Sequence, residues 1–341
     1  MAHDQFPASD EVLEERLSRP DQETIAALAA LDGDVIVLGA GGKMGPTLAR
    51  MARRALGNSA RRVLAVSRFS DGAVVSALEA ADVEVLRADL ADPRQVSALP
   101  HAANVLWMAG QKFGTTGDPV GTWTHNVVAS VHAAEHYAGA RIVCFSTGNV
   151  YGRSAVARGG SQEGDALLPD GEYAASTIGR ERVFESVARR SGSPLLLYRL
   201  FYACDLRYGV VTEIARKVLH GEPVDLSTGW VNVIWQGDAN RLALRGLTAA
   251  SVPATALNVT GPMVRVREIA ERCALYAGVS PRFAGRESEE ALVANVHRLD
   301  DELPYTALPL ETLCTWAVDW LRANGRVLDK PTKFEVRDGR F

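Results

Sequence analysis

Residues 35–50 read VIVLGAGGKMGPTLAR, and this stretch decides the fold. An apolar, β-branched run, typical of a buried strand, is followed by glycines at positions 39, 42 and 45 and then by helix-forming residues. Gly39 permits a tight turn, Gly42 lets the backbone approach a pyrophosphate, and Gly45 lets the helix pack against the sheet. This order is typical of a dinucleotide-binding turn, where the helix N-terminus favours phosphate; the alternative is a tight turn without ligand.

Outward from this turn, apolar strands alternate with helices along the first half of the chain. We expect strands over residues 34–39, 62–67, 83–86, 104–108, 141–145 and 194–200. We expect helices to about residue 55 and over residues 73–81, 122–137 and 173–190. This alternation predicts the α/β class, with a Rossmann-type doubly wound parallel sheet in the strand order 3-2-1-4-5-6.

Beyond residue 200 the pattern becomes less regular and predicts a smaller C-terminal substrate lobe. Helices are expected over residues 211–219, 238–249, 266–277 and 310–323. We therefore divide the chain into four parts. They are a helical N-terminal arm (1–32), broken at Pro20, a dinucleotide-binding Rossmann domain (33–200), a substrate-binding lobe (201–325) and a C-terminal tail (326–341).

The composition favours an ordinary folded enzyme. The chain has 341 residues, 47% of them hydrophobic, and a net charge of −4, which gives no electrostatic reason to expect nucleic acid or a membrane surface as a partner. No signal sequence or membrane-spanning run of about 18 apolar residues is seen. The four cysteines are widely spaced, which favours buried free thiols and a cytoplasmic location.

The end of the second predicted strand bears on the choice of cofactor. Sites for NAD usually place an acidic residue there, on the ribose 2′-hydroxyl. Here the strand ends in Ser67 and Arg68, which are suited to hydrogen-bond and pair with a 2′-phosphate, and Lys43 in the glycine turn adds a second cation. We therefore favour NADP over NAD. The alternative is that Arg68 is a solvated strand end.

Five further segments carry a family pattern. They are Asp89-Leu90, the run Met108-Ala109-Gly110-Gln111-Lys112, Asn126, the run FSTGNVYG at residues 145–152 and the run NVTG at residues 258–261. With the glycine spacing they resemble the extended short-chain dehydrogenase/reductases, the NAD-dependent epimerase/dehydratase family, over roughly residues 33–325. The resemblance implies hydride transfer with a nicotinamide cofactor. The cofactor-lining residues are then Gly39, Gly42, Lys43, Met44, Gly45, Ser67, Arg68, Asp89, Leu90, Met108, Ala109, Gly110, Lys112 and Thr177.

The resemblance also implies catalytic roles for three residues. Tyr173 matches the family's acid/base tyrosine, Thr147 its substrate-orienting hydroxyl and Asn126 its central-helix asparagine. A tyrosine moves a proton during hydride transfer only if its high pKa is brought down. The alternative for Tyr173 is an ordinary amphipathic tyrosine at the start of a helix.

One departure concerns the charge that acts on this tyrosine. The family's lysine, four residues after the tyrosine, is replaced by Thr177, which can hydrogen-bond a ribose but supplies no charge. Lys112 on the loop after strand four, or Arg180 on the same helix face as Tyr173, could compensate. The alternative is a catalytically inactive protein that senses NADP(H) and acts through a protein partner.

A second departure concerns the substrate. Tyr202 stands where the family has an asparagine that holds a nucleotide diphosphate, Val231 where it has an arginine, and Trp235 where histidine is common. A diphosphate without cationic or amide partners binds poorly. We therefore expect a free sugar, sugar acid or lactone rather than a nucleotide sugar. Arg207 is either a carboxylate ligand or a surface arginine.

The helix over residues 122–137 raises two further questions. His132 and His136 fall in an HxxEH pattern that can bind zinc, but no third ligand is signalled, so we expect no metal and interpret the helix as packed or at an interface. By resemblance, this helix and the helix of Tyr173 form a two-fold bundle, which implies a homodimer.

Overall fold

Seven parallel strands form the central sheet of the computed structural model, which describes residues 5–328 and 332–336. Along the sheet they are β3 (Glu84–Arg87), β2 (Val63–Ser67), β1 (Val35–Leu38), β4 (Asn104–Trp107), β5 (Arg141–Thr147), β7 (Leu195–Leu200) and β11 (Thr255–Val259). The first six keep the predicted order 3-2-1-4-5-6. The predicted α/β class and doubly wound topology are therefore confirmed.

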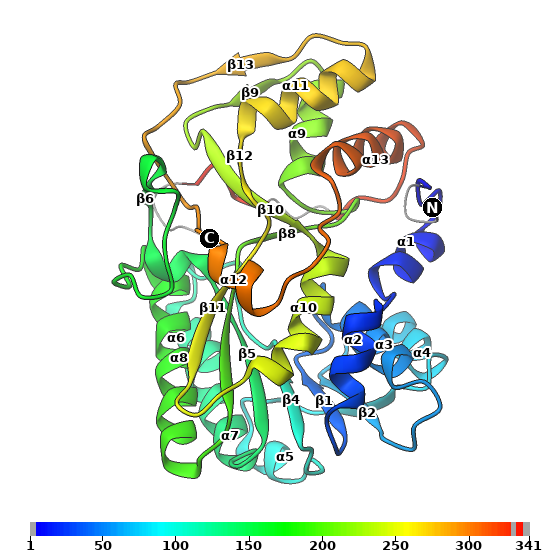
Figure 1. The fold of residues 1–341 in the computed structure, drawn as a ribbon, viewed down its shortest axis with the longest axis vertical. Coiled ribbons are helices and arrows are strands. Elements are labelled where there is room, and N and C mark those ends of the chain that lie inside the picture. Colours follow the sequence, from blue (N-terminus) through cyan, green and yellow to red (C-terminus); the bar gives the residue numbers. More distant parts are fainter. Residues whose placement is uncertain (1–4, 329–331, 337–341) are drawn as a thin grey trace.

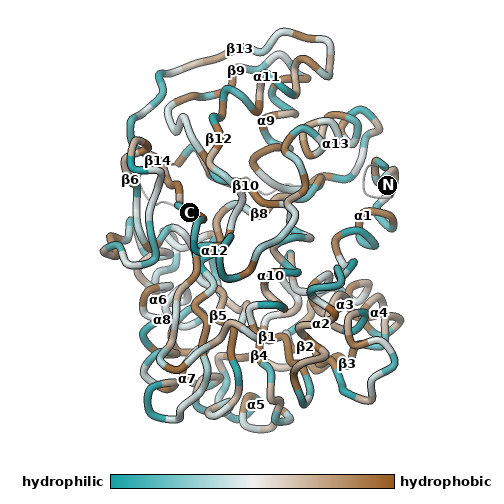
Figure 2. The backbone as a smooth tube through the Cα atoms, viewed as in Figure 1, coloured by the Kyte–Doolittle hydropathy of each residue, from teal (hydrophilic) through white to brown (hydrophobic). Residues whose placement is uncertain are grey.

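Alternating side chains of the strands build a core on each face of the sheet. Val35 and Val37 of β1 pack in the core that includes α3 (Gly45–Leu56) and α10 (Gln236–Ala249). The intervening Ile36 and Leu38 point to the other core, beneath α7 (Ala129–His136) and α8 (Gly171–Ser191). Figures 1 and 2 show helices on both faces and mainly hydrophobic colouring along these strands. Shorter elements connect them: α4 (Gly72–Glu79), α5 (Pro93–Ser97), α6 (Pro119–Trp123), η1 (Thr124–Val128), η2 (Gly148–Tyr151) and η3 (Val156–Arg158).

The C-terminal lobe has its own sheet and its own core. Its principal sheet comprises β8 (Tyr202–Cys204), β10 (Trp230–Trp235) and β12 (Met263–Arg265). Three helices contact one another beside it: α9 (Val210–Leu219), α11 (Val266–Ala277) and α13 (Leu310–Arg322). The remaining elements are β9 (Pro223–Asp225) with β13 (Arg282–Ala284), β14 (Glu290–Ala291) with β6 (Ser154–Ala155), and α12 (His297–Glu302).

The chain crosses between the two bodies more often than the sequence indicated. Both α10 and β11 lie in the range expected for the lobe, yet α10 covers the Rossmann sheet and β11 extends it as a parallel neighbour of β7. The lobe is consequently built from two stretches of chain. One precedes α10 and the other follows β11. A parallel neighbour needs a crossover connection, and α10 supplies it.

The N-terminal arm forms two short helices that pack against both the lobe and the Rossmann domain (Figure 1). These are α1 (Asp10–Leu17) and α2 (Gln22–Ala29), on either side of Pro20. α2 packs against α10 and α3, and Glu14 of α1 forms ion pairs with Arg50 and Arg207. The arm thus joins the helix of the glycine turn to the first loop of the lobe.

Two smaller expectations concern the cysteines and the membrane. All four cysteines are buried and free, as predicted. Within residues 5–328 and 332–336, none of the helices combines the length and apolar character needed to cross a bilayer.

Candidate active site

The glycine turn fits a dinucleotide. A Cβ at Gly39, where φ is +91°, would lie 2.5 Å from the amide nitrogen of Ala109, and one at Gly45 would lie 2.4 Å from the carbonyl oxygen of Ala40. Packing therefore requires both glycines. Gly42 differs, because it is exposed and a Cβ there would meet only the Gly39 carbonyl oxygen, at 3.5 Å. The free space at Gly42 and the N-terminus of α3, which lacks a side-chain cap, suit a pyrophosphate.

Two arginines lie at the carboxyl ends of β2 and β3, where the resemblance places the adenosine of the cofactor. Ser67 ends β2 beside the turn, and a Cβ at Gly41 would lie 2.6 Å from its hydroxyl oxygen. The side chain of Arg68 is exposed. Arg87, paired with Ser67 in register, donates to the backbone carbonyl of Arg68 at 3.1 Å. Sequence reasoning missed Arg87, although aligning the ends of the second and third strands would have placed it here.

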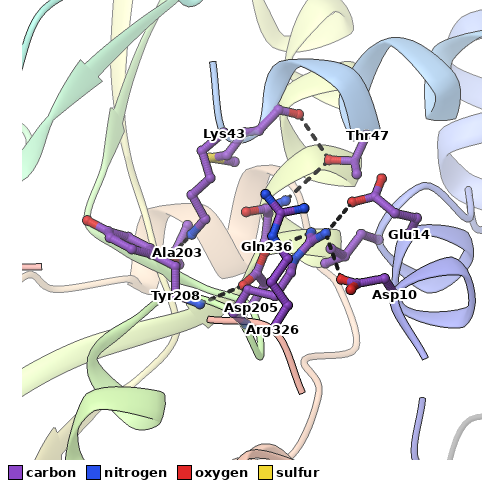
Figure 3. Close-up of polar contacts among 12 residues, drawn as sticks. Asp10, Glu14, Lys43, Thr47, Ala203, Asp205, Tyr208, Gln236 and Arg326 are labelled. Carbon is purple, nitrogen blue, oxygen red and sulfur yellow. Dashed lines mark hydrogen bonds and ion pairs between the residues drawn. The ribbon is translucent and has the colours of Figure 1, made fainter. Parts of the chain in front are cut away.

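Lys43 points away from this pair of arginines. Its Nζ donates to the carbonyl oxygen of Ala203 at 3.1 Å and lies 4.1 Å from the centre of the Tyr208 ring (Figure 3). Burial lowers the pKa of Lys43, and the nearby Asp205 carboxylate acts in the opposite direction. The expectation that Lys43 adds a second cation for a 2′-phosphate is therefore not supported, because the ammonium reaches the lobe instead.

Other predicted cofactor residues gather along the same edge of the sheet. The amide of Met108 donates to the Leu38 carbonyl at 2.8 Å, which brings Ala109 against Gly39. Asp89 follows β3, where its Oδ1 accepts from the Ala91 amide at 3.0 Å, and Leu90 beside it is buried. The structure thus brings the loops after β1, β3 and β4 together, as the resemblance implied.

Asn126 lies in a π-helical segment that the sequence did not indicate. The predicted helix 122–137 is divided into α6, the π-helix η1 and α7. The amide of Asn126 is fully buried; its Oδ1 accepts from the Gln111 amide at 2.7 Å, and its Nδ2 donates to the Gln111 carbonyl at 3.0 Å. It also donates to the hydroxyl of Ser176 at 2.9 Å. Asn126 therefore positions the loop after β4 relative to α8.

Thr147 and Tyr173 meet at the centre of the edge. Thr147 is the last residue of β5, and Tyr173 lies in the first turn of α8. Their side chains are hydrogen-bonded to each other, and the Thr147 hydroxyl also accepts from Nδ2 of Asn149 at 2.9 Å. Burial raises the pKa of Tyr173, while the Arg180 charge and the Thr147 hydrogen bond lower it. The predicted hydroxyl pair is thus brought together in a desolvated place.

Arg180 is the cation that acts on Tyr173. Its guanidinium is buried and donates to the Phe145 carbonyl at 2.9 Å and to Oδ1 of Asn126 at 2.9 Å. A Cβ at Gly110 would lie only 2.4 Å from its Nη2, so the glycine there makes room for the charge. Arg180, seven residues after Tyr173, supplies a fixed positive charge where Thr177 supplies none.

Lys112, the other compensating cation considered, faces the lobe and the tail. Its Nζ donates to the carbonyl oxygen of Thr332 at 3.3 Å. Burial, aided by the charges of Lys43 and Lys333, lowers the pKa of Lys112 to about 8, against the attraction of Glu213. Among the causes that shift the pKa of Tyr173, the charged group is Arg180.

Thr177 is buried beneath the tyrosine. Its hydroxyl donates to the Tyr173 carbonyl at 2.8 Å, inside the same helix, and the residue has no exposed surface. Only an acceptor lone pair is left for a ribose. A ribose contact of Thr177 stays a prediction, one that this geometry does not favour.

Two of the positions predicted to contact the substrate are core residues. Val231 and Trp235 lie in the core of the lobe, where Trp235 packs against Trp316. Arg207 is not available to a ligand carboxylate, because it pairs with Asp205 and with Asp10 and Glu14 of the N-terminal arm. The structure thus shows Arg207 as a partly buried link between carboxylates of the arm and of the lobe.

In the HxxEH helix, the side chains of Glu135 and His136 contact other residues of the same chain. Nε2 of His136 lies 3.0 Å from the Leu99 carbonyl, its ring stacks on His101, and Glu135 pairs with Arg190. In the part of the chain that the structure describes, no cluster of three or more His, Cys, Asp or Glu residues is arranged to hold a metal.

A doubly wound sheet, a pyrophosphate-fitting glycine turn and a buried Thr–Tyr pair at the carboxyl edge define a nicotinamide-dependent enzyme of the extended short-chain class. Residues 35–247, more than half of the chain, match the sequence model of the NAD dependent epimerase/dehydratase family. The chain belongs to that family and is an enzyme of its type. A search of curated protein sequences gives no match.

Solved structures of similar fold include several sugar-nucleotide enzymes. MoeE5, in complex with UDP-glucuronic acid and NAD, is 24% identical with a TM-score of 0.67, covering 86% of this chain and 100% of its own. UDP-glucuronic acid 4-epimerase from Bacillus cereus, in complex with NAD, is 17% identical with a TM-score of 0.69, covering 85% and 98%. UDP-glucose 4-epimerase from Thermotoga maritima, with UDP-glucose, is 17% identical with a TM-score of 0.66, covering 85% and 99%. At these identities the likeness establishes the fold.

Proposed function

We propose that the protein is an NAD(P)-dependent epimerase or oxidoreductase that acts on a carbohydrate-like substrate such as a free sugar, sugar acid or lactone. The observation that carries this proposal is the Thr147–Tyr173 pair, in which the phenol is desolvated and the Arg180 charge acts on it. When bound, the nicotinamide ring supplies the hydride acceptor or donor for a carbinol carbon.

The chain's own residues handle the proton and the geometry. The Thr147 hydroxyl orients the substrate oxygen, and Tyr173 takes or returns the proton at that oxygen through its phenolic oxygen. The Arg180 guanidinium stabilises the tyrosinate form by its charge. Asn126 holds the loop after β4 against α8, which fixes the position of Gly110 and Lys112.

The smaller substrate is supported by what stands where a diphosphate would bind. Related structures hold UDP-sugars. In this chain Tyr202 lines the cavity beside Asn149, and the two other substituted positions, Val231 and Trp235, are core residues. A diphosphate would find none of the cationic or amide partners that it needs at these positions.

NADP is favoured as the cofactor, with NAD as the alternative. Ser67 leaves the end of β2 without an acidic residue, and Arg68 and Arg87 provide two guanidinium groups there. Planar guanidinium groups suit a 2′-phosphate, whereas an acid at this position would suit the free 2′-hydroxyl. The related structures that contain NAD leave this choice to be measured.

The test is turnover on a defined panel of compounds. Purified protein is incubated with NADP⁺ or NAD⁺ and with free sugars, sugar acids, lactones and UDP-glucose, while nicotinamide absorbance and epimer formation are followed. We expect activity on the small compounds and a loss of about 10²–10⁴-fold in Tyr173→Phe, with cofactor affinity nearly intact. Retained turnover in that variant would refute the assignment. Cofactor binding without turnover on any compound would favour the NADP(H) sensor.

We also propose a cytoplasmic homodimer. The four buried free thiols suit a reducing compartment. The helices α6, η1 and α7 leave apolar side chains on the surface, with Val120 77%, Trp123 40%, Val128 44% and Val131 38% exposed. These residues recur at helical spacing next to α8, the helix expected to share a two-fold bundle.

A further inference from the structure

The end of the described chain is built into the cleft between the lobe and the Rossmann domain. Thr332 and Phe334 are each only 2% exposed. The amide and hydroxyl of Thr332 donate to the two carboxylate oxygens of Glu213 on α9, at 2.5 and 2.8 Å. The hydroxyl of Thr228 donates to the Phe334 carbonyl at 3.1 Å. In Figure 1 this segment lies against the lobe.

The same segment also contacts the cofactor side of the site. Lys112, from the loop after β4, donates to the Thr332 carbonyl at 3.3 Å. Residues 332–336 therefore bridge α9 of the lobe and the loop that Asn126 positions. They lie outside residues 35–247, the stretch that matches the family.

The cavity next to this segment is small. Its volume is about 40 Å³, and its walls include Asn149, Arg153, Tyr202 and Phe334. Asn149 donates to Thr147, so the cavity adjoins the predicted reacting groups. A single water takes about 30 Å³ of liquid volume, whereas pockets for drug-sized ligands measure about 300–1,000 Å³. Phe334 is one of the side chains that close this cavity, so its ring occupies space next to the predicted reacting groups.

The charged groups around this segment are of both signs. Glu213 presents a carboxylate at this end of the cleft, where it is held by Thr332. The cations Lys112 and Lys43 lie close to one another here, and Arg153 lines the cavity, so exclusion rests on the bulk of the segment rather than on charge. The ammonium of Lys112 donates a hydrogen bond to the Thr332 carbonyl.

We propose that residues 332–336 form a specificity-determining wall, which excludes the nucleotide part of a nucleotide sugar and restricts the site to small carbohydrate-like substrates. This rests on the proposed function and identifies what limits the size of its substrate. The aromatic ring of Phe334 supplies the bulk, and the Thr332–Glu213 contact fixes the segment in place.

The experiment compares binding of UDP and UDP-glucose to the full chain, to Phe334→Ala and to a chain ending at Arg326, by calorimetry. We expect weak or no binding to the full chain and at least about tenfold tighter binding to both variants. Phe283→Ala, which removes a partly buried ring of the same lobe that does not line this cavity, serves as the matched control and should leave exclusion unchanged.

Two outcomes would overturn the proposal: tight binding of UDP by the unaltered chain, or no gain in folded Phe334→Ala. The single substitution keeps the test valid if the shortened chain does not fold. Titration of the same samples with NADPH reports the cofactor site separately. If the unaltered chain neither binds NADPH nor turns over a substrate, this counts against the proposed function. Binding of UDP reports only on the wall.

Discussion

At the residue scale, the position of positive charge distinguishes this site from the pattern that its sequence resembles. Arg180 reaches the tyrosine from seven residues away, with three hydrogen bonds to Phe145 and Asn126 that leave its guanidinium fixed. Because a guanidinium stays protonated at all physiological pH values, its effect on Tyr173 does not titrate. A fixed charge beneath a buried phenol favours the tyrosinate.

Removing this charge should slow the reaction and change its pH dependence. In Arg180→Gln the pKa of Tyr173 rises further, so the fraction of tyrosinate falls at a given pH. We expect oxidation of substrate to slow by about 100-fold and its pH profile to move to higher pH. Arg180→Lys, which keeps the charge, should retain part of the activity. Measuring kcat against pH checks both.

Arg182→Gln is the control, because Arg182 lies on the same helix but pairs with Glu185 at the surface. Thermal melting of every variant separates a folding defect from a catalytic one. An unchanged pH profile in a folded Arg180→Gln would show that the charge of Arg180 is not used.

The cofactor preference also depends on single side chains. Arg68→Ala removes one guanidinium from the end of β2, and we expect it to weaken NADPH binding by about 10–100-fold while changing NADH binding little. Arg62→Ala, at the opposite end of the same strand, is the matched control, because Arg62 pairs with Asp34 and Glu84. Titration with each nucleotide gives the ratio. Equal losses for the two nucleotides would contradict a 2′-phosphate contact.

At the element scale, α8 carries the site and is locked to the sheet by a buried ion pair. Glu181 is fully buried beside Arg180 and pairs with Arg199 of β7 through two hydrogen bonds, at 2.9 and 2.8 Å. It also accepts from the Ser146 hydroxyl. The pair fixes the height of α8 above the ends of β5 and β7, and thus the position of Tyr173.

Breaking this pair should destabilise the protein more than it changes the chemistry. Glu181→Leu leaves Arg199 buried without its partner, and we expect the free energy of unfolding to fall by about 3–5 kcal/mol. Glu185→Leu, on the same helix, removes a surface ion pair and should cost less than about 1 kcal/mol. Urea unfolding monitored by circular dichroism measures both. Equal effects would mean that the buried pair does not hold α8.

The elements differ in how well their sequences indicate them. The strands from β1 to β7 that build the sheet are short apolar runs between turns, and hydrophobic periodicity predicts them. The π-helix at Asn126 was missed because its residues also suit an α-helix, and only the packing of Asn126 against the loop after β4 reveals the wider turn. β11 was missed as a sheet strand because local pattern does not state which neighbour a strand pairs with.

The candidate site shows the same division. The common location of the glycine turn, Thr147 and Tyr173 could be predicted, because motifs at strand ends fall on one edge of a parallel sheet. The direction of Lys43 and Lys112 could not, since long flexible side chains follow tertiary acceptors, here the carbonyls of Ala203 and Thr332. The position of Arg87 beside Ser67 depends on the register of β2 and β3, which the sequence alone does not give.

At the scale of the whole molecule, segments near both ends of the described chain contact the first loop of the lobe. The N-terminal arm reaches Arg207 through Asp10 and Glu14, and the carbonyl of Arg207 accepts from the amide of Leu328 at the start of the tail. Arg207 therefore links the arm, the first loop of the lobe and the tail. The aromatic residues of the tail indicate that it docks, but the sequence does not identify Arg207 as a partner, because the partners are distant in the chain.

The proposed dimer is a prediction at this scale. In Val120→Asp combined with Val131→Asp, two charges enter the exposed apolar face of α6 and α7, and we expect a monomer where the unaltered protein is a dimer. Val279→Asp, at an equally exposed valine of the lobe, is the control. Sedimentation velocity distinguishes the species. A monomeric unaltered protein, or a double variant that remains dimeric, would contradict this interface.

Nicotinamide binding at the glycine turn is the claim on which the rest depends, and a calorimetric titration of nucleotide-free protein with NADPH and with NADH tests it most directly. We expect saturable binding of one nucleotide per chain, tighter for NADPH because of Arg68 and Arg87. Tighter binding of NADH would overturn the preference for NADP. No binding of either nucleotide by folded protein would contradict the central claim.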